Sequence, residues 1–257
     1  MGLIISKANG VCELKLNRPD VFNSFNKDLA IALQNALDDC EKDKEIRAIV
    51  ITGEGKAFCA GQDLAEATDL NGPPLDSIVK DHYNPIITRL RAIEKPIIAA
   101  VNGVAAGAGA NIALACDVVI AKESASFIQA FSKIGLIPDS GGTFFLPRIV
   151  GMQKALALMM TGDKVMAKEA EAMNMIYKYV ADEIFDEEVT KLAAKFAKMP
   201  TRGFGLTKKA VNASWTNNLE QQLAVEGVLQ TEAGGTHDFK EGCTAFLEKR
   251  RPNFIGE

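Results

Sequence analysis

The chain has 257 residues, of which 47% are hydrophobic and 24% charged, and its formal net charge is −4. This composition excludes a largely disordered protein, and it allows one large core or two modest ones. The acidic balance gives no sign of the basic face that a nucleic-acid-binding protein needs. The first residues lack the basic start and long apolar run of a signal peptide, and the uncharged stretch 96–116 is broken by proline, glycine and asparagine. We therefore expect a cytoplasmic protein without a membrane span.

The five cysteines and two histidines are spread along the chain without close pairs. An odd number of cysteines with no C-x-x-C spacing argues against both a disulfide framework and a zinc site. His82 and His237 have no nearby carboxylate at a metal-ligand spacing. We expect no metal centre.

Strands alternate with helices in the first part of the chain. The turn signal Asn9-Gly10 is flanked by the segments LIIS and VCELKL, the second of which alternates, and this predicts a hairpin. The strand-then-helix order that follows predicts a parallel sheet with right-handed crossovers. The further elements predicted in chain order are a helix over 27–43, a buried strand within 46–55, a loop over 57–64, a polar surface segment around 71–74, a helix ending at Glu94, a strand over 96–101, a glycine turn, a helix from about Ala108 and a short strand over 117–121.

The chain becomes largely helical from Thr143 onward. A second region begins near Pro200, with helices expected around 206–213 and 218–231. The interpretation is therefore a core region over residues 1–199 and a C-terminal helical region over residues 200–257.

Two glycine-rich segments could bring backbone amides close to a ligand. Residues 56–64 place small side chains beside Gly61, although a plain strand-to-loop turn explains the same pattern. Residues 102–111 follow a strand and open a helix, so their free amides lie at a positive helix end that can bind phosphate or an oxyanion. The alternative there is close helix–strand packing. A dinucleotide site is weakly supported, because the third glycine of G-x-G-x-x-G is missing.

A third segment, over residues 135–143, contains Asp139 between a proline and two glycines. An aspartate in this setting is commonly a helix N-cap. It can also be a carboxylate base beside an apolar pocket, where burial would raise its pKa. The residues alone leave both roles open.

Together these segments resemble the enoyl-CoA hydratase/isomerase (crotonase) superfamily, over almost the whole chain from LKLNRPDVFNSFN to EGCTAFLEKRRPNF. The resemblance implies an α/β fold of the crotonase type, a spiral of ββα units followed by a C-terminal helical trimerisation region. It also implies a homotrimer or a dimer of trimers. The motifs AFCAGQDL, NGVAAGAGA and GLIPDSGGTFFLPR closely resemble the phenylacetate-pathway isomerase branch. Its members convert ring-1,2-epoxyphenylacetyl-CoA to oxepin-CoA and shift 3-enoyl-CoA to 2-enoyl-CoA.

The resemblance also assigns site residues. It implies that the backbone N–H groups of Gln62 and Ala108 hold the thioester oxygen and that Asp139 is the acid/base. Asn111 and Phe131 occupy the positions of the two hydratase glutamates, and neither can act as a carboxylate base. The substrate-binding residues implied are Lys56, near the phosphates, Ala60, Asp63 and Leu64, along the acyl-CoA path, Asn111 and Phe131, beside the reacting group, and Phe246 and Lys249, as an adenine-nucleotide contact.

The expected activity is an acyl-CoA isomerase that shifts a double bond or rearranges a ring epoxide through a thioester enolate. No cofactor is expected apart from coenzyme A as part of the substrate. One alternative is an enoyl-CoA hydratase with a different way of positioning water. Another is a non-catalytic acyl-CoA-binding scaffold subunit. RNA binding, which some relatives show, is disfavoured by the absence of a basic stripe.

Overall fold

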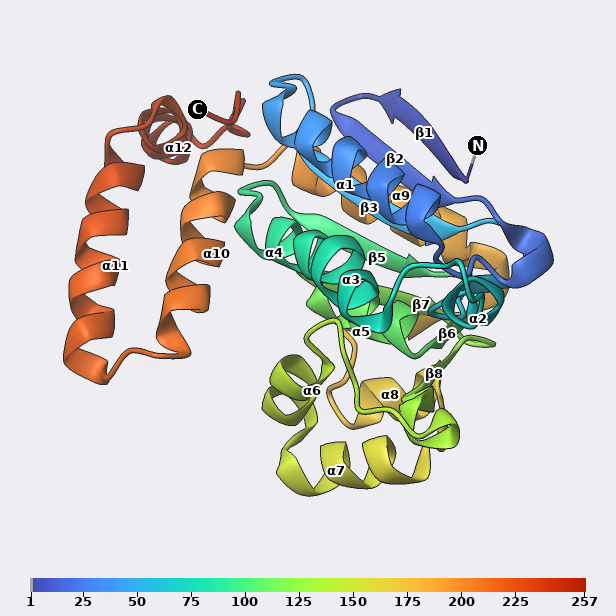
Figure 1. Ribbon diagram of the computed structural model, residues 1–257. Coiled ribbons are helices and arrows are strands. Elements are labelled where there is room, and N and C mark those ends of the chain that lie inside the picture. The colour runs from blue at the N-terminus through green and yellow to red at the C-terminus, as the bar shows by residue number, and fades with distance from the viewer. Residues whose placement is uncertain (1) are drawn as a thin grey trace.

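The computed structural model describes residues 2–257, and its core is built from repeated strand–strand–helix units. In each unit the first strand joins a large sheet, the second joins a small sheet, and helices follow (Figure 1). The three clearest units begin with the strand pairs β3 (Ala48–Gly53) and β4 (Ala57–Cys59), β5 (Ile97–Val101) and β6 (Val104–Ala106), and β7 (Val118–Lys122) and β8 (Ser126–Ile128). The predicted mixed α/β architecture is confirmed.

The large sheet has the strand order β1-β2-β3-β5-β7-β10. The predicted hairpin is confirmed: β1 (Leu3–Ala8) pairs antiparallel with β2 (Val11–Leu16), and Asn9 and Gly10 form the turn with φ values of 51° and 79°. All other pairings in this sheet are parallel, as predicted, including that of β10 (Lys178–Val180) with β7.

The small sheet has the order β4-β6-β8-β9. The family resemblance implied ββα units, but the residue patterns did not predict these strands. The segments over 57–64 and after Val101 were expected to be a loop and a glycine turn, but each holds a three-residue strand. The small sheet ends with β9 (Lys164–Met166). Both β9 and β10 interrupt the region that was expected to be helical. Three residues are too few to show a periodic apolar pattern, so these strands form because their neighbours offer backbone partners.

Helices cover both faces of the large sheet. The predicted helix over 27–43 is confirmed as α1 (Lys27–Lys42), where the Asn26 side chain accepts a hydrogen bond from Leu29 N at 3.0 Å as its N-cap. The remaining helices of the core region are α2 (Leu64–Ala67), α3 (Leu75–Ser77), the π-helix η2 (Ile78–Tyr83), α4 (Asn84–Ala92), α5 (Ala108–Ala115), α6 (Gly142–Val150), α7 (Met152–Thr161), α8 (Ala167–Ala172) and α9 (Phe185–Ala197), with the 3₁₀ turns η1 (Pro19–Val21), η3 (Ala130–Ile134) and η4 (Asp182–Ile184).

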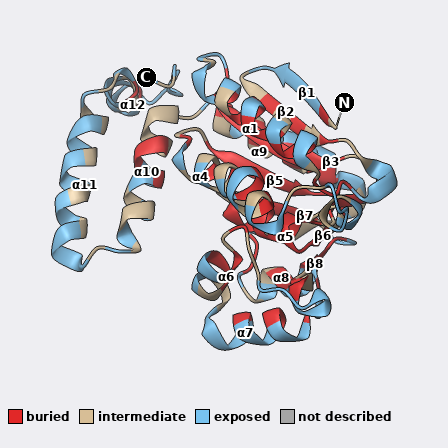
Figure 2. Ribbon diagram, viewed as in Figure 1, coloured by how far each residue is buried: buried red, intermediate tan, exposed pale blue. Residues whose placement is uncertain are grey.

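The main apolar core lies between the large sheet, the small sheet and the helices α1, α4 and α5 (Figure 2). A smaller cluster on the opposite face joins the sheet to α9, where Phe185 packs against residues such as Ile98 and Ile120. All eight residues of α5 are buried, so this helix is a rigid interior element.

Three C-terminal helices lie to one side of the sheets (Figure 1). They are α10 (Thr201–Ser214), α11 (Leu219–Gly234) and α12 (His237–Leu247). The first two correspond to the helices predicted around 206–213 and 218–231, and α12 was not predicted as a separate helix. No residue of α11 is buried. Across residues 2–257, no helix is both long and apolar enough to cross a bilayer.

Candidate active site

The first element of the site is the loop after β4. Gly61 has a φ of +94°, which favours glycine, and Phe25 forms a parallel bridge with Gln62. The bridge is made by Phe25 N donating to Gly61 O and Asp63 N donating to Phe25 O, so it does not use the Gln62 N–H. This amide is left for another acceptor.

The Gln62 side chain is fixed from two sides. Its Oε1 accepts a hydrogen bond from the Tyr83 hydroxyl at 2.9 Å, and its Nε2 donates to Glu66 Oε2 at 3.1 Å. Tyr83 is 1% exposed and ends the π-helix η2, a rare element that is frequent at functional sites. No pattern in the sequence pointed to Tyr83, because its role depends on where η2 packs.

The second element is the N-terminus of α5. Gly107 is the N-cap, with a φ of 54°, and no side chain caps the helix. The Ala108 N–H is therefore one of the unpaired amides at the positive end of a buried helix.

The two loops touch each other. A Cβ atom built on Gly61 would lie 3.4 Å from Ala108 N and 3.0 Å from Ala106 O. A Cβ on Gly109 would lie only 2.4 Å from Cys59 O. Glycine at both positions allows the approach, and two amides without backbone partners come to lie beside each other.

Asp139 is the carboxylate next to these loops, and it does not cap a helix. The N-cap of α6 is Gly141, and no side chain caps this helix. The capping role that the sequence left open for Asp139 is therefore excluded. Asp139 Oδ1 accepts a hydrogen bond from Ser140 Oγ at 2.8 Å, and Ser140 has a φ of 50° in the left-handed region. Burial raises the pKa of Asp139, and the hydrogen bond from Ser140 opposes this rise.

The charge of Asp139 acts on Tyr83, whose hydroxyl bonds the Gln62 side chain. Burial is the main cause of the raised pKa of Tyr83, and the negative charge of Asp139 is among the further causes. Asp139 is thus near Tyr83, whose hydroxyl donates a hydrogen bond to Gln62. Two other acidic residues near Tyr83 are already engaged: Asp63 pairs with Arg18 at 2.8 Å, and Glu66 accepts from Gln62 Nε2.

These features can be set against known proteins. A family model described as enoyl-CoA hydratase/isomerase matches residues 6–257. The chain belongs to the enoyl-CoA hydratase/isomerase family. It is 47% identical over 251 residues to the 1,2-epoxyphenylacetyl-CoA isomerase of Escherichia coli (strain K12), covering 96% of each chain. It is 45% identical over 249 residues to a protein of Rhodobacter capsulatus named a probable enoyl-CoA hydratase, covering 97% of this chain and 96% of that protein.

Solved structures of the same family share the fold. The enoyl-CoA hydratase of Bacillus anthracis superposes with a TM-score of 0.92 at 33% sequence identity, covering 100% of both chains. The crotonase-type fold predicted from the motifs is confirmed, and the description of the family names enoyl-CoA as its substrate.

The remaining residues predicted beside the reacting group take different positions. Phe131 is 6% exposed, and its ring carbon Cζ lies 3.9 Å from the position of a Cβ on Gly107, so it covers the start of α5. Asn111 was expected to contact substrate, but it is 0% exposed. Its Nδ2 donates to Asp139 O and its Oδ1 accepts from Gln129 Nε2, both at 2.8 Å. Its polar atoms therefore bind protein instead of facing the ligand.

Ala60 and Asp63 lie in the loop after β4, Leu64 begins α2, and Lys56 directly precedes β4. Lys56 and Leu64 are exposed and Ala60 is half-buried, while Ala60 N donates to Phe22 O at 3.0 Å. Asp63 was expected to contact substrate, yet its carboxylate pairs with Arg18 and caps α2 through Ala65 N at 3.1 Å. The structure shows a scaffolding role for Asp63 within the chain.

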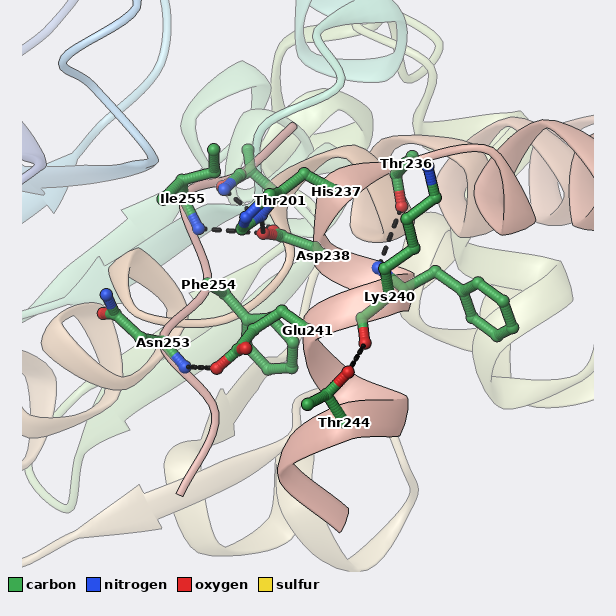
Figure 3. A network of polar contacts seen from close by, with 12 residues as sticks. Thr201, Thr236, His237, Asp238, Lys240, Glu241, Thr244, Asn253, Phe254 and Ile255 are labelled. Carbon is green, nitrogen blue, oxygen red and sulfur yellow. Dashed lines mark hydrogen bonds and ion pairs between the residues drawn. The ribbon is translucent and has the colours of Figure 1, made fainter. Parts of the chain in front are cut away.

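Phe246 and Lys249 do not join the site of their own chain. Phe246 lies near the end of α12 and Lys249 follows this helix, which lies at the opposite side of the picture from α2 (Figure 1). The C-terminal tail is hydrogen-bonded to the start of α12 (Figure 3): the Asp238 carboxylate accepts from Ile255 N and Gly256 N, both at 2.8 Å. Phe246 remains 82% exposed in this arrangement. The adenine-nucleotide contact expected for these two residues stays a prediction.

Proposed function

We propose that the chain is an acyl-CoA isomerase that moves a double bond from C3–C4 to C2–C3 of a 3-enoyl thioester. The Asp139 carboxylate takes a proton from C2, and the electron pair passes through the dienolate to the thioester oxygen. The Gln62 and Ala108 N–H groups stabilise the negative oxygen, and one such donor contributes typically 10²–10³ in rate. Asp139 returns the proton at C4. A ring epoxide such as 1,2-epoxyphenylacetyl-CoA is proposed as a second substrate, supported by the Escherichia coli relative's name.

The observation that carries this proposal is the state of Asp139. Its carboxylate is half-buried, its pKa is raised by burial, and its side-chain partner is a neutral hydroxyl. A carboxyl whose pKa lies closer to neutrality is a better general base at physiological pH. Asp63 and Glu66 cannot serve in this way without breaking contacts that fix the loop of Gln62.

Hydration is the second candidate, because the Rhodobacter capsulatus relative carries a hydratase name at 45% identity. Water addition in this family would need two carboxylates to position and activate water. Asn111 has its amide turned to Asp139 O, and Phe131 places an apolar ring over Gly107. Both features favour return of the proton over addition of water.

The test is Asp139→Asn assayed with 3-enoyl-CoA, with a ring-epoxide CoA ester and with 2-enoyl-CoA in water. We expect isomerisation to fall by about a thousandfold, equivalent to ~4 kcal/mol. Asp163→Asn, which changes an exposed aspartate in a turn, is the matched control and should leave the rate unchanged.

Three results would contradict the proposal. Near-normal isomerisation by Asp139→Asn would show that Asp139 is not the catalytic base. Rapid hydration of 2-enoyl-CoA by the unaltered protein without isomerisation would favour the hydratase. Tight acyl-CoA binding without turnover would favour a scaffold subunit.

We further propose a homotrimer or a dimer of trimers in which Phe246 and Lys249 contact the CoA bound to a neighbouring copy. In support, α11 buries no residue, Leu219 and Leu223 are exposed, and a groove of about 950 Å³ lies between α10 and α11. Light scattering of the purified protein tests the assembly, and a monomer with full activity contradicts it.

The proposed chemistry uses no resident cofactor, because coenzyme A arrives with the substrate. We propose a cytoplasmic location, supported by the free thiols of all five cysteines, four of them buried.

A further inference from the structure

A chain of two hydrogen bonds crosses the interior behind the candidate base. Gln129, next to the end of β8, donates from Nε2 to Asn111 Oδ1 at 2.8 Å. Asn111, in α5, donates from Nδ2 to the Asp139 carbonyl oxygen at 2.8 Å. Gln129 is 5% exposed and Asn111 0% exposed, so solvent cannot replace either bond.

The two bonds have only one possible direction. The Asp139 carbonyl oxygen is an acceptor, so Asn111 must turn its NH₂ group toward it and its oxygen toward Gln129. Gln129 must then present its own NH₂ group. Gln129 Oε1 consequently has no hydrogen-bond partner among residues 2–257, which is unusual for a buried acceptor. The unmet acceptor shows that the bond to Asp139 determines the orientation of both amides.

The turn that carries Asp139 packs directly on Asn111. Gly142 N donates to Asp139 O at 2.8 Å, and a Cβ on Gly142 would lie 2.3 Å from Asn111 Nδ2. The Asp139 peptide is thus fixed by two donors, one from its own turn and one from α5.

Asn111 and Ala108 are three residues apart on the same helix, so they lie on neighbouring positions of one face. The Asn111 bond therefore ties the base to the same rigid element that supplies one oxyanion donor.

We propose that Asn111 is a positioning residue that sets the distance between Asp139 and the Ala108 amide, and that Gln129 acts by orienting Asn111. This inference rests on the proposed isomerase function. It has a consequence for chemistry, because a carboxylate at position 111 would place an acceptor against the Asp139 carbonyl and a negative charge near the Asp139 carboxylate. Asn111→Glu therefore loses isomerisation and does not gain hydration.

The test is a double-mutant cycle in the full-length protein with Asn111→Ala, Gln129→Ala and the double variant. A displacement on the scale of 1 Å at a catalytic group can reduce the rate by about 100-fold. We expect kcat for 3-enoyl-CoA isomerisation to fall about 10- to 100-fold in Asn111→Ala, with KM changed by less than about threefold. Because Gln129 acts through Asn111, the double variant should be no slower than Asn111→Ala.

The controls separate positioning from loss of structure. Thr52→Val removes a different buried hydrogen bond, from Thr52 Oγ1 to Ala100 O, and should keep kcat. Gln129→Glu keeps the shape of the side chain but replaces the donor by an acceptor, so it should behave as Gln129→Ala even if Asn111→Ala folds poorly. Thermal unfolding of each variant identifies those that remain folded.

Four outcomes overturn the inference: wild-type kcat in folded Asn111→Ala, wild-type kcat in Gln129→Glu, additive effects in the double variant, or hydration by Asn111→Glu. The parallel Asp139→Asn assay separates the two proposals. If Asp139→Asn is inactive while Asn111→Ala is fully active, only the positioning role fails. If Asp139→Asn is active, the proposed function itself fails.

Discussion

Gly61→Ala tests the contact on which the paired amides depend. The added methyl group would lie 3.0 Å from Ala106 O and 3.4 Å from Ala108 N, so backbone atoms on both sides must shift by a few tenths of an ångström. The φ of +94° also strains any L-residue. Strain of this kind is of the order of 1–3 kcal/mol, and loss of one oxyanion donor reduces the rate by about 10²–10³.

We therefore expect Gly61→Ala to be destabilised by about 1–3 kcal/mol and to lose about 100-fold or more in kcat. The matched control is Gly10→Ala, which has a similar φ of +79° but meets no atom closer than 3.4 Å and lies in the β1–β2 turn. This control should share the loss of stability and keep kcat.

The assay combines urea unfolding with steady-state kinetics on 3-enoyl-CoA for both variants. The reasoning is refuted if Gly61→Ala keeps kcat within about threefold of the unaltered protein while losing as much stability as Gly10→Ala. That result would mean that the two amides do not stabilise the transition state together.

Three further predictions concern the surroundings of Asp139 and Gln62. Burial raises the pKa of Asp139 in the folded state, so the folded protein favours the protonated carboxyl. The contribution of this protonation to the free energy of unfolding is lost as pH rises through the folded pKa. Asp139→Asn should therefore raise the free energy of unfolding at pH 7, with the gain disappearing below about pH 4, near the unfolded pKa. Ser140→Ala removes the hydrogen bond that lowers the pKa of Asp139, so the ascending limb of the pH–rate profile should move to higher pH. Tyr83→Phe leaves Gln62 Oε1 without its donor and should lower the free energy of unfolding by about 1–3 kcal/mol, together with a lower kcat.

Each of these predictions can fail separately. A loss of stability in Asp139→Asn at pH 7 would show that the ionised Asp139 carboxylate does not destabilise the folded state. If the ascending limb of the pH–rate profile stays in place or moves to lower pH in Ser140→Ala, then Ser140 does not lower the pKa of Asp139. Unchanged stability and kcat in Tyr83→Phe would leave Gln62 positioned by its other contacts alone.

The sequence by itself determined the local features of this protein. The Asn9-Gly10 turn, the apolar stripe of α1 and the helices α10 and α11 follow from interactions within a few residues, and one segment contains all of these interactions. The ordered motifs were sufficient for the family, and the glycine-rich segments 56–64 and 102–111 indicated where backbone amides can approach a ligand.

Only the tertiary structure decided how distant segments meet. The strands β4, β6 and β8 have no pattern of their own and exist because they pair with one another. Asn111 turned out to hold the Asp139 peptide, Tyr83 to hold Gln62, and Asp63 to pair with Arg18. Each of these depends on contacts between elements far apart in the chain, and residue spacing carries no information about which of many polar partners will be within hydrogen-bond reach.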